Sequence, residues 1–181
     1  MSVREILYVG FVLLGLSGAV SAQAGAATYY SVDEISRSVF GAANVQNTAV
    51  WLTADRKSES AEVFGSALTQ ARFRYQYADG TRLWLLNEIG KDKPISYAVA
   101  TKDGKISRIE VMVFRESRGD EIRLPQYTAQ FQNLSLTEDG DLSAHVDGIS
   151  GATYSVRSMK KVAKMALLLD RWASEDHAGT P

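Results

Sequence analysis

Polar and apolar side chains alternate through the middle of the chain, and a period of two predicts β-strands there. The alternating segments are residues 73–77, 83–86, 95–100 and 106–114. Asp79-Gly80 separates the first two segments and Asp103-Gly104 the last two. Asp-Gly between two such segments is a strong signal for a tight hairpin. A third turn, at residues 138–141, precedes another apolar segment at 142–146.

Helix signals lie on both sides of this strand region. Ser31 followed by Glu34 is a capping box, which predicts a short helix that ends by Gly41. A second helix is expected over residues 58–72, with Gly65 inside it. The last helix has the clearest pattern, because its apolar residues recur at helical spacing. These residues are Val156, Met159, Val162, Ala163, Ala166 and Leu169.

The opposite face of this last helix carries a row of cations. They are Arg157, Lys160, Lys161, Lys164 and Arg171, which we call the cation row. One interpretation is a solvated surface, and the alternative is a docking site for an acidic partner or an anionic membrane. Leu168 lies within the row and favours docking.

Together these elements predict a single α+β domain, built from antiparallel hairpins with flanking helices and a long amphipathic C-terminal helix. No repeat, charge block or Pro/Gly/Ser-rich linker divides the chain. We expect residues 23–96 to form the N-terminal part, 97–172 the region with the candidate chemistry, and 173–181 a tail.

The first residues have the pattern of an export signal. An apolar run at 6–19 follows Arg4, and small residues occupy 20–22. A positive head, a short apolar run and a small-residue cleavage site are typical of a secretory signal peptide. We therefore expect residues 1–22 to direct the protein to an extracytoplasmic, periplasmic location. The alternative is an uncleaved inner-membrane anchor that extends to Ala27.

Composition removes several classes of function. The 181 residues carry a net charge of −1, which argues against broad electrostatic binding to nucleic acid. The chain has no cysteine, so it has no disulfide, thiolate metal site or cysteine nucleophile. Its two histidines, His145 and His177, are too few for a histidine-rich metal site, and we expect no metal.

The candidate chemistry lies in one nonapeptide directly before the last helix. Its residues are Asp147, Gly148, Ile149, Ser150, Gly151, Ala152, Thr153, Tyr154 and Ser155. The glycines allow a tight turn, Ala152 leaves space, and Thr153 or Ser155 is a suitable helix cap. The first amides of a helix favour an anion, and Arg157 could add a charged contact. The segment is therefore either a phosphate cradle or simply a well-capped helix start.

The same nonapeptide resembles the flavinylation motif of the FMN-binding domain family. Relatives include the flavin-bearing subunits of the sodium-pumping NADH:quinone oxidoreductase and of the Rnf electron-transport complex. The resemblance implies that Thr153 carries FMN through a phosphoester bond installed by a flavin transferase. Ser150, Gly151 and Ala152 would form the turn packed on the phosphate, and Asp147 would serve the transfer or bond to the turn.

A second, weaker match lies after the strand at 106–114. Family members carry a Glu-Thr-Pro-Gly-Leu-Gly-like loop near the flavin, and this chain has Glu116-Ser117-Arg118-Gly119. Glu116 and Gly119 fit that loop and Ser117 is a similar replacement, whereas the proline and second glycine are missing. The resemblance adds Glu116 and Ser117 to the expected cofactor-binding residues, beside Gly148, Tyr154, Ser155 and Arg157.

The resemblance implies an electron carrier that meets membrane or extracytoplasmic redox proteins. Two alternatives remain open: a flavin-dependent reductase with its own small substrate, and a non-redox binding module of the same fold. Tyr154, Trp84 and Trp51 are candidates for stacking on the flavin ring, and His145 for approaching it. Each of these four residues has an ordinary structural interpretation as well.

Overall fold

One antiparallel sheet forms the centre of the computed structural model, which describes residues 25–178. Its six strands follow the order β1-β6-β5-β4-β3-β2. They are β1 (Ala27–Thr28), β2 (Gln46–Trp51), β3 (Arg72–Ala78), β4 (Thr81–Ile89), β5 (Pro94–Lys102) and β6 (Lys105–Phe114). Both predicted hairpins are confirmed, with Gly80 at φ 78° between β3 and β4 and Gly104 at φ 72° between β5 and β6.

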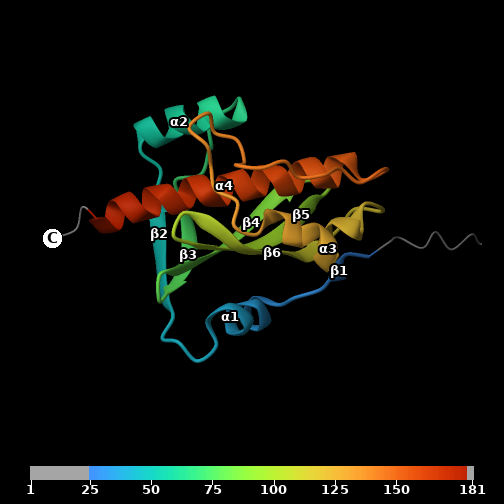
Figure 1. The fold of residues 1–181 in the computed structure, drawn as a ribbon, viewed down its shortest axis with the longest axis horizontal. Helices are drawn as coiled ribbons and strands as arrows, with labels where there is room; N and C mark the ends of the chain where they lie inside the picture. The colour runs from blue at the N-terminus through green and yellow to red at the C-terminus, as the bar shows by residue number, and fades with distance from the viewer. Residues whose placement is uncertain (1–24, 179–181) are drawn as a thin grey trace, which may run out of the picture.

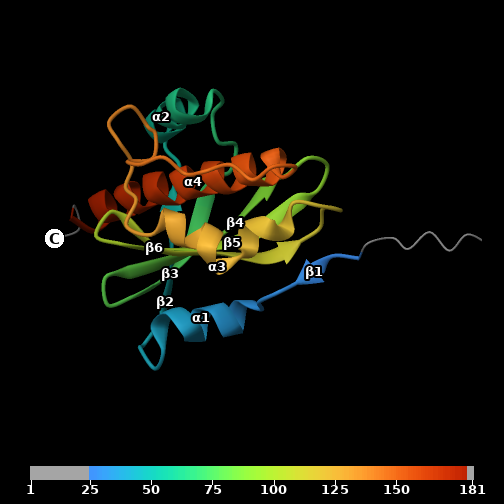
Figure 2. The same ribbon diagram turned by 45° about the vertical axis from the view of Figure 1, so that its right-hand side comes forward.

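Helices cover both faces of the sheet (Figures 1 and 2). The first helix, α1 (Val32–Phe40), lies on one face, and the long α4 (Thr153–Ala178) crosses the other. The helix α2 (Ala54–Phe64) lies beyond α4, on the side away from the sheet. Between β6 and α4 the chain forms η1 (Asp120–Arg123), α3 (Pro125–Thr128) and η2 (Ala129–Phe131). The predicted α+β domain with a long C-terminal helix is therefore confirmed.

The two faces of the sheet bury apolar cores of different size. The larger core lies between the sheet and α4 and includes Trp84, Tyr97 and Trp172. The smaller one packs Ile35 of α1 against Leu83 and its neighbours in the central strands. Burial of these side chains is the main force that holds α4 and its first residues in place.

A polar cluster inside the larger core ties the C-terminal half of α4 to the sheet. The buried Asp170 carboxylate lies 3.1 Å from an Arg82 guanidinium nitrogen and accepts a hydrogen bond from the Thr101 hydroxyl at 2.6 Å. Trp84 donates its indole N–H to the same hydroxyl at 3.0 Å. Buried charges persist in folded proteins when they are paired in this way.

Two elements differ from the sequence-based expectation. The second helix begins at Ala54, not at 58, because the Thr53 hydroxyl caps it by accepting the Arg56 amide. It ends at Phe64, since Gly65 adopts a left-handed conformation, so residues 66–71 are not helical. The strand β2 was not predicted from its sequence QNTAVW. The structure shows that all six of its residues pair with β3.

The cation row is engaged largely within the protein. Lys161 lies 2.9 Å from Glu88, Lys164 lies 3.8 Å from Asp141, and Arg171 pairs with Glu59. Leu168 is fully buried, so the prediction that it belongs to a docking surface was wrong. The sheet and α2 cover α4 from two sides, and a residue opposite the main apolar face is buried as a result.

The segment expected to be a signal peptide or anchor, residues 1–22, lies outside the described residues. Within residues 25–178, no helix has the length and apolar character needed to cross a membrane.

Candidate functional site

The nonapeptide forms a turn that leads directly into α4, as the sequence predicts. Gly151 adopts a left-handed conformation with φ 83°, and the Ala152 amide donates to the Ile149 carbonyl at 3.0 Å. The Ala152 carbonyl then accepts the Val156 amide at 2.9 Å, which places Ala152 at the helix cap. This tight turn fixes the direction in which the following residues enter the helix.

The predicted cap itself was wrong, because Thr153 and Ser155 both lie inside the helix. Ala152 has no side-chain oxygen that could accept a bond from the first amides. Across residues 25–178, no side chain accepts a hydrogen bond from the amides of Thr153, Tyr154 or Ser155. The partial positive charge at this helix start is therefore left without an internal acceptor, which suits a bound anion.

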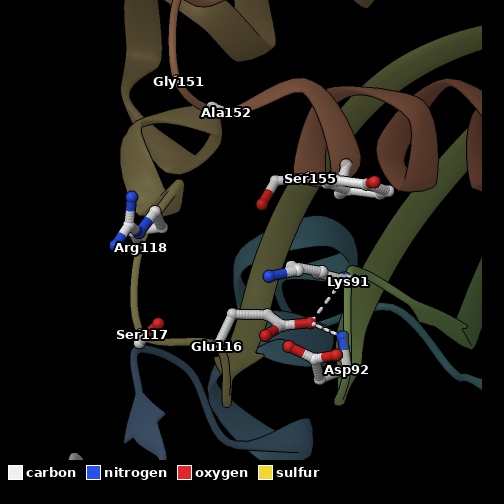
Figure 3. A pocket seen from close by; sticks show the side chains of 9 residues that line it. Lys91, Asp92, Glu116, Ser117, Arg118, Gly151, Ala152 and Ser155 are labelled. Atoms are coloured by element: carbon white, nitrogen blue, oxygen red, sulfur yellow. Dashed lines mark hydrogen bonds between the residues drawn. The ribbon is translucent and has the colours of Figure 1, made fainter.

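A cleft of about 300 Å³ lies beside the helix start (Figure 3). Three separate segments line it: Lys91 and Asp92 after β4, Glu116, Ser117 and Arg118 after β6, and Gly151, Ala152, Tyr154 and Ser155 from the nonapeptide. The two segments that resemble family motifs therefore meet in one cleft. Its volume is at the lower end of the range for small-molecule sites.

Glu116 holds one wall of this cleft. One of its carboxylate oxygens accepts the backbone N–H groups of Lys91, Asp92 and Lys93 at 2.6, 2.7 and 2.9 Å. Burial raises the pKa of this carboxyl, but the three amides and the Lys93 charge outweigh it and lower the pKa below its usual value. Glu116 is therefore a carboxylate at neutral pH, and it fixes the backbone of this turn.

Two glycines let these segments approach so closely. A Cβ atom at Gly90 would lie 2.7 Å from the Glu116 carboxylate, and one at Gly119 would lie 2.6 Å from the Ser155 hydroxyl. Gly119 also has φ 90°, a conformation that side-chain-bearing residues rarely adopt. The loop that carries Glu116 and Ser117 can thus pack on the start of α4 only because residue 119 is glycine.

Thr153 faces a different groove from the residues on either side of it. It is exposed and lines a groove of about 490 Å³ beside α2. The other lining residues are Val63, Phe64, Asp141, Leu142, Val156, Arg157, Lys160, Lys161 and Lys164. Four members of the cation row therefore line the same groove as Thr153, and two of them, Lys161 and Lys164, pair with Glu88 and Asp141. Lys160 also donates to the Val146 carbonyl at 2.6 Å, and the Arg157 guanidinium lies 5.6 Å from the Tyr154 ring centre.

Asp147 and Ser150 are exposed on the turn before the helix. The Asp147 backbone is fixed at both polar groups, because its amide donates to Gln130 at 2.9 Å and its carbonyl accepts the Tyr127 hydroxyl at 3.2 Å. Burial and the Asp147 charge raise the pKa of Tyr127 to about 12, so this hydroxyl keeps its proton and remains a donor. Gly148 lies in the open, with no atom near the position of a Cβ.

Three residues considered for contact with a flavin ring lie elsewhere. Trp84 is buried beneath α4, and Trp51 is exposed on β2, at the other end of the sheet order from β6. His145 is exposed, 3.7 Å from the Asp147 carboxylate, and lines neither the cleft nor the groove. Only Tyr154, which is half exposed, lines the cleft.

Sequence reasoning missed the contribution of Lys91, Asp92 and Arg118 to the cleft, and that of Val63 and Phe64 to the groove. The turn at residues 90–93 has no recognisable motif, although Gly90 and Pro94 at its ends mark it as a tight connection. Its role arises from Glu116, which is more than twenty residues further along the chain.

Comparison with protein families gives one match. Residues 90–168 match the family model described as the FMN-binding domain. This span begins at the turn held by Glu116 and ends within α4, so it includes every residue that lines the cleft. The searches of curated proteins and of solved structures found no match.

Proposed function

The chain carries a domain of the FMN-binding family, and on that premise we propose an extracytoplasmic electron carrier with FMN attached covalently to Thr153. FMN supplies the redox chemistry when bound, and the protein determines its orientation, exposure and potential. The observation that carries the proposal is Thr153, exposed at a helix start that no side chain caps within residues 25–178, in a groove that Arg157 and Lys160 also line.

The surroundings of Thr153 suit a phosphoester. The amides at the start of α4 lack side-chain acceptors within residues 25–178, and the helix dipole favours negative charge there. Arg157 and Lys160 line the adjoining groove within two turns of Thr153 and would offset the charge of the phosphate. In the transfer itself, the Thr153 oxygen bonds to phosphorus, the leaving group of an activated FMN donor departs, and the flavin transferase takes up the hydroxyl proton.

Two surfaces beside Thr153 could receive the ring system. The cleft offers polar walls at Glu116, Ser117 and Arg118, whereas the groove offers the apolar side chains of Val63 and Phe64. The resemblance of the loop that starts at Glu116 to the flavin-proximal loop of the family favours the cleft. Lys91 extends across it (Figure 3), and a cation beside the flavin would stabilise its reduced, anionic form.

The residues of the cleft favour a carrier over a reductase. Glu116 is a carboxylate that accepts hydrogen bonds from three backbone amides, so it is a poor proton donor. A reductase would need a fixed proton donor above the ring. Lys91 and Tyr154 line the cleft and carry protons, but within residues 25–178 neither side chain forms a hydrogen bond that would fix it. Electrons would pass from a membrane donor to a second extracytoplasmic protein, with export directed by the N-terminal segment.

Covalent attachment is tested on protein exported by a host that supplies an active flavin transferase. We expect flavin fluorescence at the band of the denatured wild-type protein and none in Thr153→Ala. Ser174→Ala is the matched control, since it removes an exposed hydroxyl from the same helix, away from the nonapeptide, and should stay fluorescent. A dark wild-type band beside another flavinylated substrate would contradict the proposal, and so would a fluorescent Thr153→Ala band.

A further inference from the structure

The sheet face that carries α1 is only partly covered. Ile35 of α1 packs on Leu83, Ala98, Ala100 and Met112, which belong to β4, β5 and β6. The strands β2 and β3 contribute no buried residue to this smaller core. In the described part of the chain, the outward residues of these two strands therefore lie outside the core that α1 covers.

Strand register shows which side chains share this uncovered area. Gln76 is paired with Leu83, so Arg72 and Arg74, which alternate with Gln76 along β3, point to the same face as Leu83. Trp51 is paired with Arg72 and Ala49 with Arg74. A groove of about 710 Å³ lies here, lined by Val32, Asn47, Thr48, Ala49, Arg72, Phe73, Arg74, Tyr75, Gln76, Leu83 and Leu85. We call it the sheet groove.

The sheet groove has an apolar floor that water reaches. Val32 is 44% exposed and Leu85 is 37% exposed, and Trp51, which is paired with Arg72 at the edge of the sheet, is 58% exposed. Large apolar side chains gathered in one place mark an interaction surface more often than scattered ones do. The Arg72 guanidinium lies 5.1 Å from the Trp51 ring centre, and Trp and Arg are the residues that most often dominate binding energy at interfaces.

The charges of the sheet groove are of one sign. Arg72 and Arg74 line it, and no carboxylate does so in the described residues. Within residues 25–178, neither arginine forms an ion pair. Glu34 on the neighbouring helix is turned to its own helix start, where it accepts the Ser31 amide at 2.8 Å. A ligand for this groove must therefore bring its own negative charge and apolar groups.

We propose that the sheet groove binds an acidic amphipathic segment of a partner protein, with its carboxylates on Arg72 and Arg74 and its apolar side chains against Trp51 and Leu85. Charge complementarity identifies the occupant, since an apolar segment alone would leave both guanidinium groups without counter-charges. Arg72, Arg74 and Leu83 lie on the face of the sheet opposite α4, so a partner held there leaves the start of α4 open. This proposal does not depend on flavin attachment at Thr153.

Binding can be tested with two dye-labelled peptides of equal length, one alternating Glu with Leu and the other Lys with Leu. Fluorescence anisotropy should show saturable binding of the acidic peptide to the full protein, and no saturable binding of the basic one. The double variant Arg72→Glu/Arg74→Glu should bind the acidic peptide with an affinity at least about tenfold lower than the wild type. The control Lys102→Glu/Lys105→Glu changes the charge equally at two exposed turn lysines and should leave binding unchanged.

Tryptophan quenching locates the bound peptide. Trp84 and Trp172 are buried, so quenching by acrylamide reports mainly on Trp51. The acidic peptide should protect Trp51 from acrylamide, and Trp51→Phe should remove the protected signal while the protein stays folded by circular dichroism. Equal affinity of the double arginine variant and the wild type for the acidic peptide would overturn the proposal. So would protection of Trp51 only on self-association or only with anionic lipid vesicles.

Discussion

The two halves of α4 differ in whether their polar groups are buried and paired or exposed to solvent. Near its C-terminal end, Asp170 is fully buried and is held by Arg82 and Thr101. At its start, Thr153 and Tyr154 are exposed, and no side chain in the described residues caps the helix. We call the C-terminal half, where the buried Asp170 is paired inside the protein, the closed half of α4. The exposed Thr153 and Tyr154 in its first turn are the open start.

This difference separates stability from binding. A buried charge without a partner is costly, so the closed half pairs Asp170 with Arg82, although Asp170 Oδ2 and Arg82 Nε have no hydrogen-bond partner in the described residues. An exposed helix start is solvated by water at little cost, and its amides and hydroxyl remain available to a ligand. Substitutions in the closed half should therefore change the free energy of unfolding, and substitutions at the open start should change attachment.

The largest effect on stability is expected for Asp170→Ala. It leaves Arg82 buried without a counter-charge, and breaking such a pair costs about 3–5 kcal/mol. Urea unfolding of the flavin-free protein measures the loss, with Glu175→Ala as the control on the exposed surface of the same helix. A loss no greater than that of the control would show that the buried pair does not anchor α4.

Gly119→Ala tests how closely the loop after β6 approaches the helix start. Positive φ costs about 1 kcal/mol for alanine, and the contact with the Ser155 hydroxyl should add about 1–2 kcal/mol. Gly104→Ala is the matched control, because Gly104 has φ 72° but open space at the Cβ position. Equal losses in the two variants would mean that the close approach costs nothing. Adding Ser155→Ala should recover part of the Gly119→Ala loss.

Glu116→Gln should have a smaller effect, about 1 kcal/mol, because the side chain is only half buried. The pKa of Glu116 is lower in the folded protein than its ordinary value of 4.5, so its contribution is present above that pH. The contribution is lost as pH falls through the folded-state pKa. The variant should therefore lose less stability than the wild type between about pH 5 and pH 3. Identical pH profiles would contradict this role.

Hydrogen exchange gives a local measurement of the same carboxylate. The amides of Lys91, Asp92 and Lys93 should exchange faster in Glu116→Gln, because the charged acceptor that holds all three is gone. Amides in the central strands β5 and β6 should keep their protection. Faster exchange across the whole sheet would indicate general destabilisation instead of a local loss of the turn.

The smallest effect on stability is expected for Thr153→Ala in flavin-free protein. Thr153 is exposed and its side chain does not cap the helix, so the unfolding free energy should stay within about 0.5 kcal/mol of the wild type. The same substitution should abolish covalent flavin. A large loss of stability would contradict the prediction that the start of α4 contributes to attachment and not to the free energy of unfolding.

Local signals explain most of what could be predicted about the fold. The capping box of Ser31 and Glu34 and the two Asp-Gly turns depend on neighbouring residues only, and the structure confirms all three. The helix predicted over residues 58–72 was wrong at both ends, although its true cap, Thr53, is equally local. The strand β2 escaped prediction because its outward residues face an uncovered part of the sheet and need not alternate clearly in polarity.

The candidate site shows the same distinction between features set by neighbouring residues and features set by tertiary packing. The sequence alone determined the glycine-containing turn and the position of Thr153 near the start of a helix, because these follow from adjacent residues. It also determined the resemblance to the family that the match over residues 90–168 confirms.

Only the tertiary structure decided what surrounds Thr153. It brought the turn held by Glu116 to one side of the helix start, and α2 to the other. It also turned Leu168 inward and supplied Lys161 and Lys164 with partners from distant segments. The physical reason is that adjacent residues fix backbone conformation, whereas burial and charge pairing depend on whichever segments the fold packs against them.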